Sequence, residues 1–143
     1  EYVGYFDGSC NPNPFGELGV GAVVYYEDKH KDNIEIWSYS KMYPPSKTNS
    51  NNVAEYMGLL ALLDYFIDNS LTNESIIIRG DSEMVVNQMK GEYKIKSGLY
   101  RMKGLEAKGK VGLFTNLRIY WCPREGNKRA DYLSNPEQKD YHK

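Results

Sequence analysis

The chain contains few cysteines and histidines, and their scarcity excludes several kinds of site. Among 143 residues there are two cysteines and two histidines. Two cysteines cannot form the disulfide framework of a small secreted protein, so we expect Cys10 and Cys122 to be free thiols. No cluster of Cys and His offers a zinc site, and His30 and His142 give little support to a Ser/His/Asp triad.

Long apolar runs, a signal peptide, internal repeats and low-complexity segments are also missing. No apolar run approaches the roughly 18 residues of a membrane-spanning helix. We therefore expect a soluble, cytoplasmic monomer without membrane contact. Hydrophobic residues at 41% and charged residues at 26% are typical of a globular protein. We expect one domain over residues 1–143 and a flexible polar tail from about residue 135 to 143. Because the chain begins at Glu1 without Met, it is compatible with a piece of a longer protein.

The net charge of −1 does not indicate a nucleic-acid partner, but the distribution of charge does. The segment from Lys90 to Lys110 carries seven basic and two acidic residues, so it is net +5 and the rest of the chain is net −6. A basic stripe on an acidic body can follow the phosphates of a nucleic acid. A charge run alone is more often a solvated helix face, so the segment needs support from other features.

The hydrophobic pattern predicts alternating strands and helices. Strands are expected at residues 2–6, 19–26, 33–42, 75–79 and 117–122, and helices at about 53–68, 83–89, 98–108 and 127–133. Three sequential strands should pair antiparallel, whereas strands separated by helices should pair in parallel. The sequence therefore predicts an α/β fold: a five-stranded mixed sheet, with three antiparallel strands then parallel strands, and helices on both faces.

Four carboxylates fall at the ends of these predicted elements. Asp7 ends the first strand before Gly8, and Asp81 ends the buried fourth strand. Glu55 lies in the first turn of the first helix, and Asp131 lies in the last helix. Carboxylates gathered at one edge of a sheet repel one another and raise each other's pKa. Divalent cations remove that penalty, and oxygen ligands suit Mg²⁺ or Mn²⁺.

Each acid also has a local interpretation that is favoured when the residue is taken alone. Asp7 can form an ordinary Asp-Gly turn, and Asp81 can cap a helix. Glu55 can complete a capping box with Asn52, which would then be the N-cap. Asp131 can be an exposed acid on an amphipathic helix. The hypothesis of a metal site depends on all four acids meeting.

Four segments resemble the motifs of the type 1 ribonuclease H family, in its compact archaeal and bacterial form. They are FDGSCNPNP, TNSNNVAEY, IIIRGDSEMVVNQMKGEYKIKS and CPREGNKRADYLSN, which occur in the family's order across essentially the whole chain. The resemblance implies an RNase H-like fold. It also implies a metal-dependent endoribonuclease that cleaves the RNA strand of RNA/DNA hybrids and leaves 5′-phosphate and 3′-hydroxyl ends.

The same resemblance implies roles for individual residues. Two Mg²⁺ ions, for which Mn²⁺ can substitute, would bind roughly 3.5–4 Å apart. Asp7 would bridge both ions. With Asp7, Asp131 would hold the ion that activates water, whereas Glu55 and Asp81 would hold the ion at the leaving oxygen. Arg124 would assist at the scissile phosphate or in product release.

Hybrid contacts are implied by position in the motifs. The loop of residues 10–13 and the amides of Asn51 and Asn52 would face the minor groove, where RNA displays its 2′-hydroxyls. Ser50 and Ser97 would hold a phosphate of the DNA strand. The expected substrate-binding set is Cys10, Asn13, Ser50, Asn51, Asn52, Glu83, Lys90, Lys94, Lys96 and Ser97.

The chain departs from the family pattern in its first loop and beside its third acid. Pro12 and Phe15 stand where the family usually has glycine, which affects how closely the RNA backbone approaches. Glu83 stands where Gln is common, so a contact to a base edge is expected to be altered. Trp121 and Tyr100 could stack on bases, but core packing is favoured for both.

Two other functions fit parts of the pattern. A non-catalytic nucleic-acid-binding module of this fold usually loses acidic ligands, whereas all four are present here. Other metal nucleases of the RNase H-like superfamily, such as integrases and junction resolvases, typically have three core acids at different spacings.

Overall fold

A five-stranded mixed sheet forms the centre of the computed structural model, which describes residues 1–30 and 32–135. Its strands are β1 (Tyr2–Asn11), β2 (Glu17–Glu27), β3 (Asn33–Tyr43), β4 (Ile76–Gly80) and β5 (Leu117–Trp121). The helices are α1 (Asn51–Asp68), α2 (Glu83–Met89), α3 (Arg101–Val111) and α4 (Lys128–Ser134), with a short 3₁₀ turn at Arg124–Gly126. The tail expected after residue 135 lies outside the described residues.

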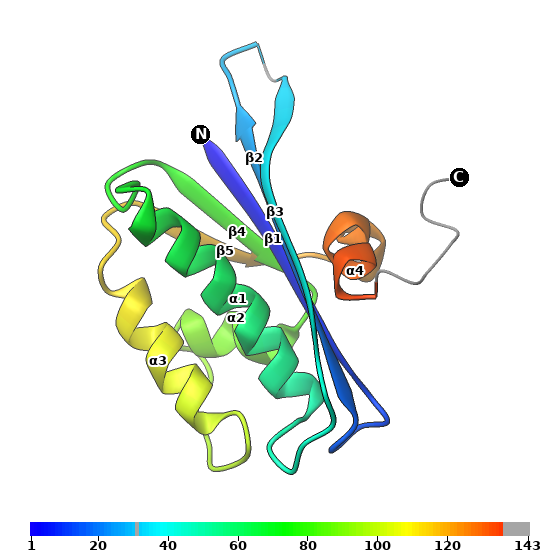
Figure 1. Cartoon of the computed structure of the whole chain (residues 1–143). Coiled ribbons are helices and arrows are strands. Elements are labelled where there is room, and N and C mark those ends of the chain that lie inside the picture. Colours follow the sequence, from blue (N-terminus) through cyan, green and yellow to red (C-terminus); the bar gives the residue numbers. More distant parts are fainter. Residues whose placement is uncertain (31, 136–143) are drawn as a thin grey trace.

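The strand order is β3-β2-β1-β4-β5, as the predicted topology requires. The first three strands pair antiparallel, and β4 pairs in parallel with both β1 and β5. Helices α1, α2 and α3 cover one face of the sheet, and α4 covers the other (Figure 1). The predicted α/β fold is therefore confirmed.

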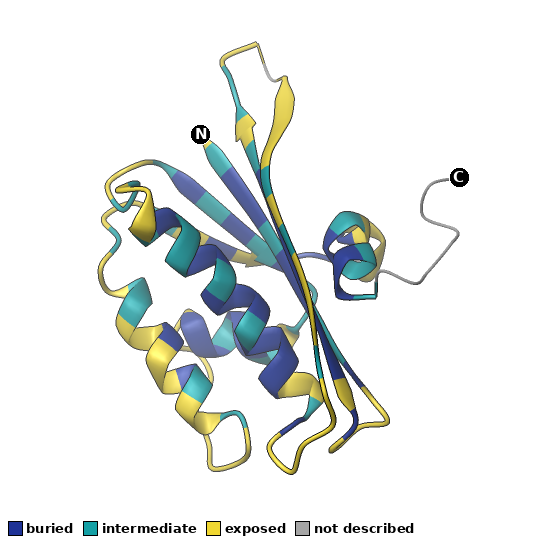
Figure 2. Cartoon of the chain, in the orientation of Figure 1, coloured by how far each residue is buried: buried dark blue, intermediate teal, exposed yellow. Residues whose placement is uncertain are grey.

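The core lies between the sheet and α1. Apolar residues at helical spacing give α1 one continuous buried face, which includes Leu59, Leu63 and Phe66 (Figure 2). They pack against fully buried strand residues such as Phe6 and Ile78. Each such side chain contributes roughly 1.5–3 kcal/mol by leaving water. This packing fixes α1 against β1 and so places Glu55 beside the sheet.

The first strand is longer than the sequence predicted. It runs to Asn11 instead of ending at Phe6, because β2 continues to pair with it as far as Asn11 opposite Glu17. Its other neighbour, β4, ends where Gly80 pairs with Phe6. Asp7 therefore lies within β1 rather than at its end, one residue beyond the carboxyl end of β4.

The residues that cap α1 and α2 rule out two local interpretations of the acids. Ser50 caps α1 by accepting the Val53 N–H at 3.2 Å, so Glu55 does not form a capping box with Asn52. Ser82 caps α2, so the side chain of Asp81 is not the cap. In the third helix, the φ of 153° at Gly98 is not helical, and α3 begins only at Arg101. Asp131 lies both in the first turn of α4 and at its centre, because this helix has only seven residues.

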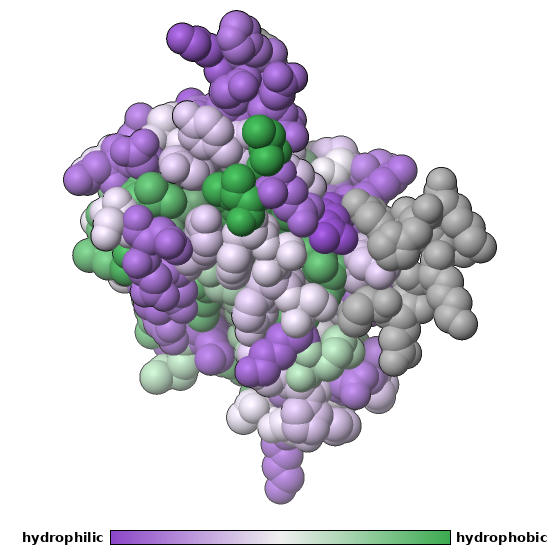
Figure 3. Space-filling model, turned by 45° about the horizontal axis from the view of Figure 1, so that its top comes forward, coloured by the Kyte–Doolittle hydropathy of each residue, from purple (hydrophilic) through white to green (hydrophobic). Residues whose placement is uncertain are grey.

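The surface seen in Figure 3 is largely hydrophilic, with a compact hydrophobic patch near the protruding end of the β2–β3 hairpin. On the edge strand β3, Ile34 and Ile36 are both exposed. Within the described part of the chain, no helix is both long enough and apolar enough to cross a membrane.

Both cysteines are buried, and neither forms a disulfide. Cys10 lies inside β1, not beyond its end as the sequence suggested, and Cys122 follows β5 directly. Strand β4 separates those two strands. We expect thiol titration of the denatured, unreduced protein to find two free thiols. A titration that finds none would contradict this arrangement.

Candidate active site

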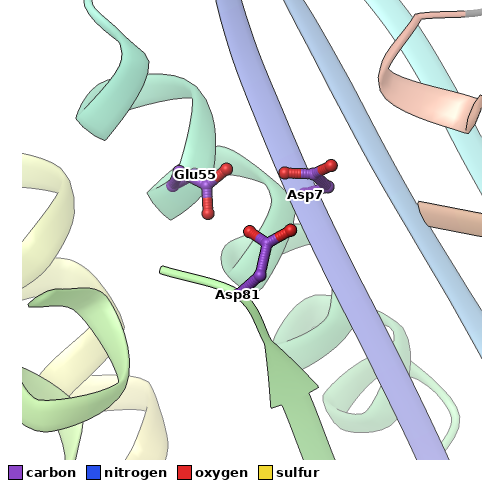
Figure 4. Close-up of side chains that lie close together, drawn as sticks. All are labelled: Asp7, Glu55 and Asp81. Atoms are coloured by element: carbon purple, nitrogen blue, oxygen red, sulfur yellow. The ribbon is translucent and has the colours of Figure 1, made fainter. Parts of the chain in front are cut away.

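Three carboxylates from different elements converge at the carboxyl end of β4. Asp7 projects from β1, Glu55 from α1, and Asp81 from the residue that follows β4 (Figure 4). Each offers a carboxylate oxygen, and these oxygens lie within 4.8 Å of one another. Asp131 of α4 joins the three in lining an open hollow of about 550 Å³. All four acids singled out in the sequence therefore meet in one place.

A glycine next to Asp7 allows α1 to approach β1 closely enough to form this cluster. A Cβ atom at Gly8 would lie 2.2 Å from the backbone carbonyl carbon of Ala54, so no larger residue fits without moving the helix. The Gly8 N–H donates to Asp7 Oδ1 at 2.9 Å and to Glu55 Oε1 at 2.8 Å. One backbone amide thus orients both carboxylates.

The cluster is electrostatically unfavourable in the absence of cations. Burial raises the pKa of Asp7 to about 7, and the negative charges of Asp81 and Asp131 act in the same direction. Burial, followed by the neighbouring Asp7, raises the pKa of Glu55 well above its usual value. Burial also raises the pKa of Asp81, while the Asn127 side chain and the charge of Arg124 oppose that rise.

These residues fit a divalent-metal site. Glu55 Oε2 is buried and has no hydrogen-bond donor within the described structure. A buried carboxylate oxygen without a donor, close to two other carboxylates, is stabilised by a cation. The ligand set is entirely oxygen, which suits hard ions such as Mg²⁺ and Mn²⁺.

Sequence reasoning missed the part played by Asn127, which is only 1% exposed. Its Nδ2 donates to the Phe6 carbonyl oxygen at 2.9 Å, immediately before Asp7, and its side chain lies beside Asp81. The backbone carbonyl oxygen of Asn127 accepts the Asp131 N–H at 3.0 Å. Asn127 therefore connects β1, Asp81 and α4. Its sequence signal is that of an ordinary helix start, which gives no sign of this role.

The residues expected at the minor groove surround the start of α1. The Cys10 N–H donates to Asn51 Oδ1 at 2.7 Å, and the Asn51 N–H donates to Asn13 Oδ1 at 3.0 Å. Asn51 also lines the acidic hollow, and Asn52 is exposed next to it. The Ser50 hydroxyl is engaged in capping α1. The β1–β2 loop and the start of α1 therefore form one connected surface beside the acids.

The remaining expected contacts lie along α2 and the segment that joins it to α3. Glu83 opens α2 and accepts the Tyr93 hydroxyl at 3.4 Å, so part of its hydrogen-bonding capacity is used within the chain. The others are exposed: Lys90, Lys94, Lys96 and Ser97. Lys94 and Lys96 line a second hollow, which shares no lining residue with the acidic one. The structure thus does not bring these residues to the acids.

The two large aromatic residues behave differently from each other. Tyr100 stacks on Tyr56 with ring centroids 6.0 Å apart and packs against the core, as expected. Trp121 does not pack in the core: it is 52% exposed at the edge strand β5. Its Nε1 donates to the Asp81 carbonyl oxygen at 3.3 Å, and with Arg124 it lines the acidic hollow.

Comparison with known proteins identifies a family and several relatives that this chain resembles. The family described as reverse transcriptase-like matches residues 6–136. The bifunctional protein Rv2228c of Mycobacterium tuberculosis is 35% identical over 129 residues, which are 90% of this chain and 33% of that protein. This chain therefore spans about a third of the length of that relative.

Solved structures agree closely with the fold. RNase H1 from the halophilic archaeon Halobacterium salinarum superposes with a TM-score of 0.80 at 30% identity, covering 97% of this chain and 98% of that one. LC11-RNase H1, solved in complex with an RNA/DNA hybrid, gives a TM-score of 0.77 at 31% identity, with 95% of each chain covered.

Proposed function

This chain belongs to the type 1 ribonuclease H family, and from that membership we propose that it hydrolyses the RNA strand of RNA/DNA hybrids. The proposal depends mainly on one observation: carboxylate oxygens of Asp7, Glu55 and Asp81 lie within 4.8 Å of one another. They line a hollow open to solvent, together with Asp131. The LC11 relative was solved with the proposed substrate class bound.

The four acids would hold two divalent ions, Mg²⁺ or Mn²⁺. When bound, such ions polarise a phosphodiester and lower the pKa of an attacking water. The chain contributes the preorganised ligands: the Gly8 N–H fixes the orientation of Asp7 and Glu55, and Asn127 secures the backbone on either side of the cluster. Arg124, on the rim of the hollow, is placed to donate to a phosphate oxygen.

Recognition of the hybrid would depend on the connected surface beside the acids. The polar groups of Asn13, Asn51 and Asn52 would face the minor groove, where the 2′-hydroxyls distinguish RNA from DNA. All four acids come from one chain, so the proposed site needs no residue from a second copy.

A comparison of three duplexes tests the proposal. In Mg²⁺, we expect cleavage of an RNA/DNA hybrid and little action on duplex DNA or duplex RNA of the same sequence. Equal cleavage of hybrid and duplex DNA would favour a different metal nuclease of the superfamily. Binding of the hybrid without cleavage would favour a non-catalytic module.

Neutralising Lys90, Lys94 and Lys96 together should weaken hybrid binding more than it slows chemistry. All three are exposed in the most basic segment of the chain and lie outside the acidic hollow. Each lost phosphate contact should make the slope of log affinity against log salt less negative by about 0.7–0.9. Turnover at saturating hybrid should change little, because phosphate contacts position the substrate.

A single-charge control is Lys29→Gln, to be compared with each lysine changed singly; Lys29 lies in the β2–β3 turn, at the opposite end of the molecule from the segment that joins α2 to α3 (Figure 1). It should leave the salt slope unchanged. An unchanged slope in the triple variant would show that the basic segment is a solvated face.

A further inference from the structure

The loop that joins β1 to β2 holds a bulky apolar residue in a backbone conformation that side chains rarely adopt. Phe15 has φ = 77°, in the left-handed region where a Cβ atom crowds the backbone and glycine is favoured. Its side chain is 53% exposed, so packing within the chain does little to offset the strain. A strained residue with an exposed ring calls for an explanation outside the folding of the chain.

Hydrogen bonds hold Phe15 in this conformation. Its N–H donates to the Asn49 carbonyl oxygen at 2.9 Å, and its own carbonyl oxygen accepts the Ser46 N–H at 3.2 Å. Asn49 is itself buried, and its Nδ2 donates to the Gly16 and Pro44 carbonyl oxygens. The loop therefore requires a positive φ at this position, which glycine would satisfy without strain. The fold therefore depends on the backbone conformation and hydrogen bonds of residue 15, and the Phe15 ring is not required for them.

Hydrogen bonds connect the loop that carries Phe15 to the acidic hollow. Asn13, two residues earlier, accepts the Asn51 N–H, and Asn51 lines the acidic hollow with Asp7 and Glu55. A double helix whose scissile phosphate sat in that hollow would also pass the neighbouring β1–β2 loop, and the exposed Phe15 ring on that loop would then be available to its groove.

We propose that the Phe15 ring is a substrate-binding contact that lies against sugars and base edges in the minor groove of the RNA/DNA hybrid. This inference rests on the proposed function. A-form-like helices have a wide, shallow minor groove that displays sugars and base edges. An apolar ring that contacts those groups is removed from water, which favours binding. Because the ring touches no reacting atom, it contributes to KM rather than to kcat.

Two substitutions separate the ring from the strain. Phe15→Gly removes the ring and relieves the backbone, whereas Phe15→Ala removes the ring and keeps a Cβ atom at positive φ. Phe15→Gly should therefore have a higher Tm than Phe15→Ala. Both should raise KM for the hybrid by about 5- to 10-fold, at the lower end of the loss caused by removing an aromatic ring stacked on a base, and leave kcat within about twofold. The ring-preserving control, Phe15→Tyr, should match the wild type.

Steady-state cleavage of the hybrid and thermal unfolding of each variant provide the test. An unchanged KM in Phe15→Gly would overturn the inference. A KM that rises only in the less stable Phe15→Ala would also overturn it, because the effect would then follow loop stability. A wild-type protein that neither binds nor cleaves the hybrid would overturn the proposed function as well. A similar rise in KM in Phe15→Gly and Phe15→Ala, despite their different Tm values, is the expected result.

Discussion

Asp7→Asn is expected to lower turnover of the hybrid by more than about 100-fold, which corresponds to a loss of about 2.7 kcal/mol of transition-state stabilisation. Asp7 is buried between Glu55 and Asp81, and a neutral amide in its place cannot balance the charge of two cations. The fold should remain intact, because the substitution removes one of several mutually repelling acids. Single-turnover cleavage at saturating hybrid and Mg²⁺ measures the effect.

Asp68→Asn is a suitable control because Asp68 is the exposed last residue of α1. It removes the same charge without touching the cluster and should retain wild-type turnover. An Asp7→Asn variant that keeps more than about a tenth of wild-type turnover would contradict the assignment of Asp7 as a central metal ligand.

Without divalent metal, the free energy of unfolding is expected to fall by roughly 3 kcal/mol between pH 5 and pH 8. Burial raises the pKa of Asp7 from 3.8 to about 7. At a pH between these two values, the Asp7 carboxyl group is protonated in the folded protein and ionised in the unfolded chain. Stability therefore decreases as the pH rises through this window and levels off above it. The raised pKa of Glu55 acts in the same direction.

Urea unfolding in EDTA at the two pH values measures this change, and the difference between wild type and Asp7→Asn isolates the contribution of Asp7. Mg²⁺ or Mn²⁺ should restore stability at pH 8, where the acids are ionised, and have little effect at pH 5. Equal stability at both pH values, with no effect of added metal at pH 8, would contradict the crowded acidic cluster.

Much of the fold could be predicted because its signals are local. The apolar run in β4 and the helical spacing in α1 each identify an element from a few neighbouring residues. The order of strands and helices then leaves few topologies, and the observed sheet is the predicted one. The meeting of the four acids could be predicted because each acid lies in one of four motifs that occur in the family's order.

The details that were wrong or missed depend on tertiary structure. Asp7 lies within β1 because β2 pairs past the end of β4, and no pattern inside β1 encodes that register. Ser50 rather than Asn52 caps α1, and several polar residues in that stretch could serve equally well by composition. Asn127 contacts a residue far away in the sequence, and the positive φ of Phe15 is held by hydrogen bonds to residues 46 and 49, which lie in another loop.

End-group analysis of the reaction products decides whether the four acids act as a metal-dependent hydrolytic site. The RNA strand of a uniform hybrid, incubated in Mg²⁺ and in EDTA, should yield fragments with 5′-phosphate and 3′-hydroxyl ends in Mg²⁺ alone, with the DNA strand intact. Attack by the RNA's own 2′-hydroxyl would instead leave cyclic phosphate and 5′-hydroxyl ends and would require no metal. Such ends, or cleavage that persists in EDTA, would contradict the proposed role of Asp7, Glu55, Asp81 and Asp131.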